Sequence, residues 1–251
     1  MVLQSHDRTM NSRLIAMDLL RSFLGNGGEL KTNSTVTEIY KGDVSTDSES
    51  FHCKQVILAI GHCVKKLTGV NVKVVVSPLA VAYPSLTKHN FVRMTADLSL
   101  AFNHIYHSDG YSVMGNANYF SEINDEIDAY VKKSFVERIR SIFPGSKSAI
   151  SVYYGHKTEV VGKSQLRNYQ SHIINTGSCL VAIPGKFSLS FSLALSVCEY
   201  YGIKPVSTVQ KLASLGEVEQ FVVSPKHHMH ATYLIQGNPS NQAAPSFFSF
   251  G

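Results

Sequence analysis

The sequence predicts an α/β chain with two lobes, and three observations support this prediction. Residues 56–60, which read VILAI, form a strand with no polar face, as is typical of a central parallel strand covered on both sides. Residues 179–205 contain a second apolar strand, a glycine turn and an apolar helix. Between these segments, β-branched and aromatic residues alternate with turn residues, and this pattern favours an antiparallel sheet.

The first lobe begins with an amphipathic helix. Asn11 or Ser12 can cap this helix, because either side chain accepts hydrogen bonds from the free backbone N–H groups of a first turn. Apolar residues then recur at helical spacing until the glycine-rich residues 25–28 end the helix. Residues 35–40 are predicted as a strand, and residues 51–60 as one further strand that ends at Gly61.

The second lobe is predicted to combine an antiparallel sheet with one long helix. Residues 121–143 carry a continuous apolar stripe at helical spacing, and Pro144 and Gly145 end that helix. We assign residues 67–173 to this inserted lobe, and residues 1–66 together with 174–205 to the first lobe. Residues 206–251 form a C-terminal extension that we expect to be partly irregular.

Composition excludes several classes of protein. Charged residues make up 16% of the 251-residue chain, against roughly 25% in an average soluble domain, and the formal net charge is only +5. A disordered polyelectrolyte or a histone-like binder is therefore excluded, and no interleaving of basic and aromatic residues indicates a nucleic-acid partner. The longest apolar stretch, residues 187–201, is too short for a transmembrane span.

The four cysteines form no Cys-x-x-Cys pair. We therefore expect neither a disulfide framework nor a structural metal site, and we place the chain in a reducing, intracellular compartment. Two histidine groups leave alternatives open. His227, His228 and His230 can bind a transition metal or lie in an exposed loop, while His104 and His107 can line a pocket or lie on the surface of the sheet.

Three segments occur in an order that is similar to a known family. A helix and a glycine turn precede GELKTNSTVTEIYKGD, the strand CKQVILAIGH follows, and GSCLVAIPGKFSLSFSLALSV comes near the end. This order resembles the latter two-thirds of FAD-dependent oxidoreductases of the D-amino-acid oxidase and glycine oxidase type. The resemblance implies an incomplete FAD/NAD(P)-binding, Rossmann-like domain with an inserted, mostly antiparallel α+β substrate domain.

The resemblance also implies which residues contact FAD. In the family, a segment like NSTVTEI approaches the adenine side of the cofactor, a strand ending in Ala-x-Gly passes it, and a final strand–glycine–helix unit closes over the flavin ring. Glycine permits a close backbone approach to such a cofactor, and a helix N-terminus favours negative charge on the flavin pyrimidine edge. The implied contacts are Val36, Ala59, Gly61, Gly185, Lys186, Phe187, Ser188 and Leu189.

The sequence departs from the family pattern at two places. The opening strand–Gly-x-Gly-x-x-Gly–helix unit, which holds the cofactor pyrophosphate, is not found. We therefore expect FAD to bind only together with another polypeptide that carries this unit or covers the open sheet edge. Where the family places Gly-x-Arg-Pro, this chain has Tyr154, Gly155, His156, Lys157 and Thr158, so that Lys157 replaces the arginine that holds a substrate carboxylate.

Two functions from different classes remain. The leading interpretation is the C-terminal half of an FAD-dependent oxidoreductase that transfers a hydride from an organic substrate to flavin. The alternative is a non-catalytic structural or interaction subunit that retains half of an oxidoreductase fold. Tyr154, His156 and Lys157 are the candidate substrate residues. The sequence does not select a catalytic base among Tyr153, Tyr154 and His156.

Overall fold

A computed structural model describes residues 9–97, 101–116, 118–161, 168, 170–205, 212–222 and 224. Its elements, in chain order, are α1 (Ser12–Gly25), β1 (Val36–Tyr40), β2 (Asp43–Thr46), β3 (Ser50–His52), β4 (Ile57–Leu58), the 3-10 turn η1 (Gly61–Cys63), α2 (Val64–Thr68), β5 (Lys73–Tyr83), β6 (Phe91–Arg93), β7 (Phe102–His107), β8 (Tyr111–Asn116), α3 (Asp125–Ile142), β9 (Ala149–Glu159), β10 (His172–Asn175), β11 (Leu180–Ile183), the 3-10 turn η3 (Phe187–Leu189), α4 (Ser190–Tyr200) and α5 (Leu215–Glu219).

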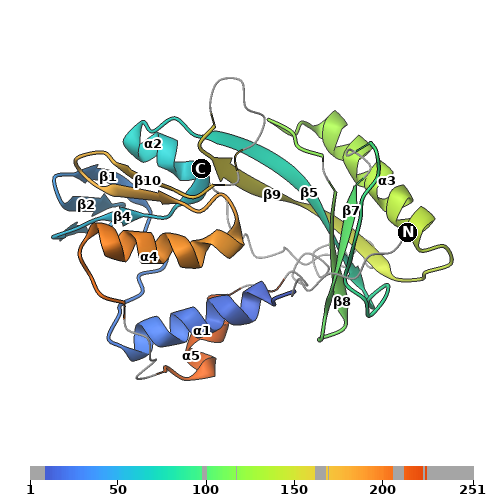
Figure 1. Ribbon diagram of the computed structural model, residues 1–251, viewed down its shortest axis with the longest axis horizontal. Helices are drawn as coiled ribbons and strands as arrows, with labels where there is room; N and C mark the ends of the chain where they lie inside the picture. Colours follow the sequence, from blue (N-terminus) through green and yellow to red (C-terminus); the bar gives the residue numbers. More distant parts are fainter. Residues whose placement is uncertain are drawn as a thin grey trace, which may run out of the picture.

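Figure 1 shows two lobes. The first contains α1, α2, α4, α5 and two small sheets, the second contains β6–β8 and α3, and β5 and β9 run side by side from one lobe to the other.

The predicted first helix is confirmed, together with its cap. The side-chain oxygen of Asn11 accepts hydrogen bonds from the backbone N–H groups of Arg13 and Leu14, at 3.1 and 3.2 Å. The short helix α5 lies along α1, where the guanidinium of Arg13 contacts the carboxylate of Glu219 at 3.2 Å. The C-terminal extension therefore contains at least one helix that is attached to the first lobe.

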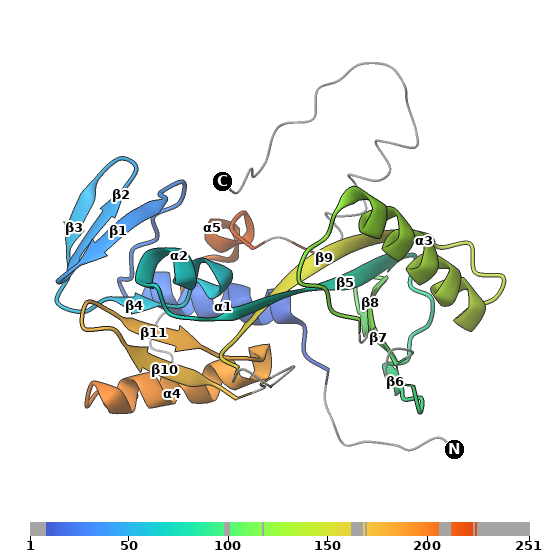
Figure 2. The ribbon, with the colours of Figure 1, turned by 90° about the horizontal axis from the view of Figure 1, so that it is seen from above.

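The first lobe contains two three-stranded sheets. One is the antiparallel sheet β1–β2–β3, and the other has the order β10–β11–β4. In the second sheet β4 and β11 are parallel, with Leu180 opposite Ile57 and Val181 opposite Leu58, as the two apolar segments predict. Figure 2 shows α4 alongside β10 and β11, and the four residues of β11 are all buried.

The expectation of one continuous strand over residues 51–60 is wrong. The strand β3 ends at His52, and the N–H of Cys53 donates to the carbonyl oxygen of Gly42 at 2.8 Å, which closes the β2–β3 hairpin. The chain then leaves this sheet and forms only the two-residue strand β4 in the other one. The expected central position is also wrong within this chain, because β4 lies at the edge of its sheet and Ile57 is 47% exposed.

The second lobe has the antiparallel sheet that the sequence predicts. Its strand order is β6–β7–β8–β5–β9, and every neighbouring pair is antiparallel. The longest pairing joins β5 to β9, in continuous register from Lys73 opposite Glu159 to Tyr83 opposite Ala149. The residue boundaries of the two domains stay a prediction, because β5 and β9 belong to both lobes.

Helix α3 covers one face of this sheet and begins later than predicted, at Asp125 instead of Ser121. The side chain of Asn124 determines this start, because it accepts a hydrogen bond from the N–H of Ile127 at 2.8 Å. Acidic residues in the first turn add stability near the positive end of the helix dipole. The core beneath α3 contains the buried residues Ala80, Ala82, Phe102, Met114, Phe135 and Ile139.

His104 is fully buried beside this core and not on the sheet surface. One ring nitrogen lies 2.9 Å from the carbonyl oxygen of His89, and the other lies 2.7 Å from the hydroxyl of Ser112. His107 is also buried and stacks on Tyr111, with ring centroids 4.4 Å apart. Both histidines therefore hold the sheet together, and neither lies in a cavity that the structure describes.

Two further findings concern the described residues only. No helix among them is long and apolar enough to cross a bilayer. No group of three histidine, cysteine or acidic residues among them is placed to bind a metal ion. The candidate ligands His227, His228 and His230 lie outside the described residues.

The buried histidines make the stability of the second lobe depend on pH. Burial lowers the pKa of His104 below its ordinary value of 6.5, and burial likewise lowers the pKa of His107. The unfolded chain then binds these protons more tightly, so stability is fully present above about pH 6.5 and is lost as the pH falls. We predict that the melting temperature drops more between pH 7.5 and 5.5 in the wild type than in His104→Gln.

The control is His89→Gln, because the side chain of His89 is exposed. This variant should show the pH dependence of the wild type in the same thermal melts. An equal drop for the wild type and His104→Gln would contradict the prediction.

Candidate functional site

A cavity of about 450 Å³ lies where the end of β9 meets the turn that follows β11. Its walls come from η1, from β9, from Tyr119, and from the end of β11 with the turn that follows it. The lining residues are Gly61, Tyr119, His156, Lys157, Thr158, Ala182, Ile183, Pro184, Gly185, Lys186 and Phe187. The structure thus brings together six residues that the sequence predicted as cofactor or substrate contacts.

The turn after β11 forms one wall of this cavity. Gly185 has φ +66°, a left-handed conformation that favours glycine. The 3-10 turn η3 follows and leads into α4, which begins at Ser190 and not at Ser188 as predicted. The N–H of Leu189 donates to the carbonyl oxygen of Lys186 at 3.0 Å, and the N–H of Ser190 donates to that of Phe187. No described side chain caps η3, so the N–H groups of Phe187 and Ser188 are the donors that this turn offers at the cavity. This arrangement favours an electron-rich group at the cavity.

The turn η1 forms a second wall and approaches β9 closely. Gly61 has φ +56°, and a Cβ atom at this position would lie 3.8 Å from the hydroxyl oxygen of Thr158. The next residue, His62, stacks on His156 with the ring centroids 5.1 Å apart and an interplanar angle of 26°. This contact between η1 and β9 fixes the orientation of the His156 ring at the cavity wall.

Lys157 supplies a positive charge inside the cavity. Its ammonium nitrogen lies 4.6 Å from the centroid of the Tyr119 ring, close enough for a cation–π interaction. The backbone of the next residue, Phe120, pairs with Val76 on β5 through hydrogen bonds of 2.7 and 2.8 Å. This bridge holds the Tyr119 ring over the lysine, so the ammonium group is positioned to contact an anionic ligand.

Five predicted contact residues do not line the cavity. Ser188 and Leu189 follow Phe187 within η3, next to the cavity wall. Val36 begins β1 in the other small sheet, paired with Thr46, and Ala59 follows β4 with its side chain exposed. The fifth residue, Tyr154, lies outside the cavity on β9 and its hydroxyl donates to Asp128 on α3 at 2.7 Å.

Tyr153 and Tyr154 are unsuited to the role of a general base. Burial, with a smaller contribution from the nearby Tyr111, raises the pKa of Tyr153 to about 12. Burial and the hydrogen bond to Asp128 also raise the pKa of Tyr154. Both phenols therefore hold their protons at neutral pH. Among the three candidate bases, only His156 lines the cavity.

Sequence reasoning missed Tyr119, Thr158 and His62. Thr158 and His62 are adjacent in sequence to residues that were selected, so extending each predicted segment by one residue would have found them. Tyr119 gave no such signal, because its position depends on the backbone bridge between Phe120 and Val76. Only the folded chain brings it to Lys157.

The comparisons with known proteins agree with this architecture. Residues 2–179 match the family model described as FAD dependent oxidoreductase. The chain belongs to this family. The matched residues include Gly61, Tyr119 and the end of β9, while the turn after β11 follows them. Among curated proteins, no relative matches the chain.

Several solved oxidoreductase structures share the fold of this family member. The glycerol-3-phosphate dehydrogenase from Bacillus halodurans complexed with FAD aligns with a TM-score of 0.56 at 11% identity, over 83% of this chain and 48% of that one. The L-amino acid deaminase from Proteus vulgaris aligns with a TM-score of 0.52 at 14% identity, over 72% of this chain and 49% of that one. The iminodiacetate oxidase from Chelativorans sp. BNC1 aligns with a TM-score of 0.52 at 12% identity, over 79% of this chain and 57% of that one. The chain thus spans about half the length of these structures.

The cofactor of the family is FAD, and the cavity fits the flavin end of this molecule. The uncapped start of η3 offers N–H donors, and the carbonyl oxygens of a flavin pyrimidine edge are acceptors. Gly61 and Gly185 leave the backbone accessible on two walls, and Lys157 and Lys186 add positive charge. The chemistry of this donor set therefore matches an electron-rich ring.

The position of Tyr154 leads to a testable prediction. We expect Tyr154→Phe to lower the free energy of unfolding by about 1 kcal/mol, because it removes one partly buried hydrogen bond to Asp128. It should leave binding in the cavity unchanged. Urea unfolding at constant pH measures the first effect, and ligand titration measures the second.

The matched control is Tyr130→Phe, because Tyr130 also lies on the α3 side of the sheet but is 71% exposed. Its unfolding free energy should equal that of the wild type. A Tyr154→Phe chain of normal stability with impaired cavity binding would show that the phenol acts in the site.

Proposed function

We propose that this chain is the C-terminal half of an FAD-dependent oxidoreductase that transfers a hydride from an organic substrate to flavin. A second polypeptide carrying the Gly-x-Gly-x-x-Gly unit completes the cofactor site. One observation carries this proposal. Residues from η1, β9 and the turn after β11, which are far apart in the sequence, line a single cavity together.

In this proposal the two glycine turns hold the flavin end of FAD. The backbone at Gly185 and at the start of η3 would hold the pyrimidine edge of the flavin, and Gly61 would permit close approach of the ring at another wall. Negative charge on that edge is stabilised by the positive end of α4 and by Lys186. FAD, when bound, supplies the acceptor for the two electrons and the hydrogen that leave the substrate as a hydride.

The side chains of β9 position the substrate. Lys157 binds an anionic group of the substrate as a point charge, in the place where the family has an arginine. His156 accepts the proton that the substrate releases from the heteroatom next to the oxidised carbon, and the stacked His62 holds the imidazole in place.

The need for a second polypeptide is supported by the first lobe itself. Within the part of the chain that the structure describes, no strand pairs with the outer side of β4, and an edge of this kind with the exposed Ile57 favours a covering partner. Apolar side chains on α1 and α4 are also about half exposed, namely Leu14, Leu19, Phe23, Phe191 and Leu195.

The test is the flavin content of the native assembly. We predict that the chain purified with its native partner has one flavin per chain by absorbance, and that the chain expressed alone has none. A colourless assembly would contradict the enzyme and favour the alternative, a structural subunit that retains half of the fold. A well-folded single chain with stoichiometric FAD would contradict the partner.

Two glycine variants separate cofactor contact from backbone strain. Gly185 and Gly202 have nearly the same φ, +66° and +65°, so alanine causes similar strain at both. Only Gly185 lines the cavity, and a Cβ at Gly202 meets nothing within 4 Å. Gly185→Ala should weaken flavin retention at least tenfold, while Gly202→Ala should retain the wild-type content. Equal retention in the two variants would exclude the flavin contact at Gly185.

A further inference from the structure

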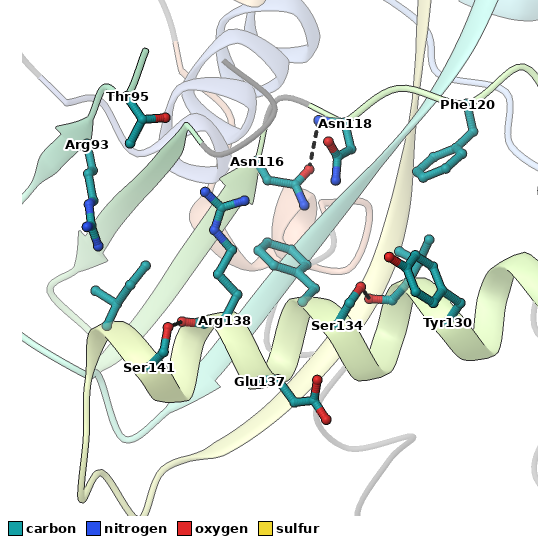
Figure 3. A pocket seen from close by; sticks show the side chains of 13 residues that line it. Arg93, Thr95, Asn116, Asn118, Phe120, Tyr130, Ser134, Glu137, Arg138 and Ser141 are labelled. Carbon is teal, nitrogen blue, oxygen red and sulfur yellow. Dashed lines mark hydrogen bonds between the residues drawn. The ribbon is translucent and has the colours of Figure 1, made fainter. Parts of the chain in front are cut away.

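A second cavity of about 640 Å³ lies between α3 and the ends of β6 and β8, in the second lobe. Figure 3 shows its side chains. Its volume is in the range of small-molecule sites, which is roughly 300–1,000 Å³. The residues that give it chemical character are Arg93, Asn116, Asn118, Phe120, Tyr130 and Arg138.

One end of this cavity is cationic. Arg93 comes from the end of β6 and Arg138 comes from α3. Burial lowers the pKa of Arg138, the charge of Arg93 lowers it further, and Asp97 acts in the opposite direction, so the two guanidinium groups are within electrostatic reach of each other. Glu137 also lines the cavity, and Figure 3 shows its carboxylate pointing away from the two arginines. Asp97 partly offsets the charge of Arg138, and the two guanidinium groups together present several donors that match an acid group.

The amide beside the arginines adds a hydrogen-bond donor. The backbone N–H of Asn118 donates to the side-chain oxygen of Asn116 at 3.1 Å. This bond fixes the orientation of the Asn116 amide, and Figure 3 shows Arg138 reaching from α3 toward it. The Nδ2 group of Asn116 therefore stays a donor beside the guanidinium groups. An acid group with several oxygen acceptors matches this set of donors.

The other end of the cavity is apolar. Figure 3 shows Tyr130 and Phe120 together at this end, away from the arginines. Phe135 from α3 also contributes apolar surface, whereas Ile142, at the end of α3, lies toward the arginines. A bare inorganic ion would leave this end empty, whereas an aromatic or aliphatic body attached to an acid group would fill it.

We propose that this cavity binds a small organic anion, with its acid group at Arg93 and Arg138 and its apolar body against Tyr130 and Phe120. The site is separate from the proposed flavin cavity and next to it. Asn118 and Phe120 line the anion cavity, while Tyr119, between them, lines the other one. One extended segment therefore forms a wall of both cavities.

Calorimetric titration of the full chain, in its purified assembly, tests the site. The probes are phenyl phosphate, benzoate, inorganic phosphate and phenol. We expect phenyl phosphate, benzoate or both to bind at least tenfold more tightly than phenol and inorganic phosphate. The better of the two organic acids identifies the acid group. Failure of both to bind more tightly than phenol would overturn the proposal.

Variants distinguish this site from a general attraction of anions. Arg138→Gln and Arg93→Gln should each weaken binding of the organic acid at least tenfold, and Tyr130→Ser should weaken it several-fold without changing that of inorganic phosphate. Lys133→Gln removes the same charge from an exposed residue of α3 that does not line the cavity, and it should bind like the wild type. Circular dichroism confirms the fold of each variant. Wild-type affinity in both arginine variants, or an equal loss in Lys133→Gln, would contradict the site.

Discussion

The antiparallel pairing of β5 with β9 is the interaction on which the rest of the molecule depends. The two strands stay in register from Lys73 opposite Glu159 to Tyr83 opposite Ala149. At one end of this pair, Ala80 and Ala82 lie in the core beneath α3. At the other end, residues 156–158 reach the first lobe and line the proposed flavin cavity. The same ladder thus builds the second lobe and positions the side chains that we propose to act at the first.

This geometry explains why the two cavities differ in chemistry. The proposed flavin cavity has backbone walls at Gly61 and Gly185, which suit the close approach of a flat ring. The cavity beneath α3 has side-chain walls, with charge at one end and aromatic surface at the other. The bridge between Phe120 and Val76 fixes the segment that separates them. A change in that bridge would therefore alter both cavities.

Local patterns in the sequence predicted those parts of the fold that depend on local physics. The cap at Asn11, the parallel pairing of β4 with β11 and the antiparallel second lobe follow from capping, apolar strands and turn residues. The break after His52 was not predictable, because it depends on a hydrogen bond from Cys53 to Gly42 across a hairpin. The late start of α3 reflects competition among several polar residues for the cap position.

The site was predicted only in part, because some of its residues are marked by local motifs and others meet only in the folded chain. The glycine turns and the β9 residues were identified through a family resemblance, and the fold brings most of them to one cavity. Tyr119 and the stacking of His62 on His156 are contacts between distant segments, and no local pattern encodes them. Tyr154 was misplaced because it shares a strand face with His156 but lies two residues earlier along β9, where its hydroxyl donates to Asp128 of α3.

An experimental structure of the flavin-bound assembly tests the central claim most directly. The account predicts the isoalloxazine ring in the cavity between the Gly185 turn and β9, with its pyrimidine edge at the N–H groups of η3 and Lys157 on the substrate side. A ring bound elsewhere on the chain, or one held entirely by the partner polypeptide without contact to Gly61 or Gly185, would contradict it.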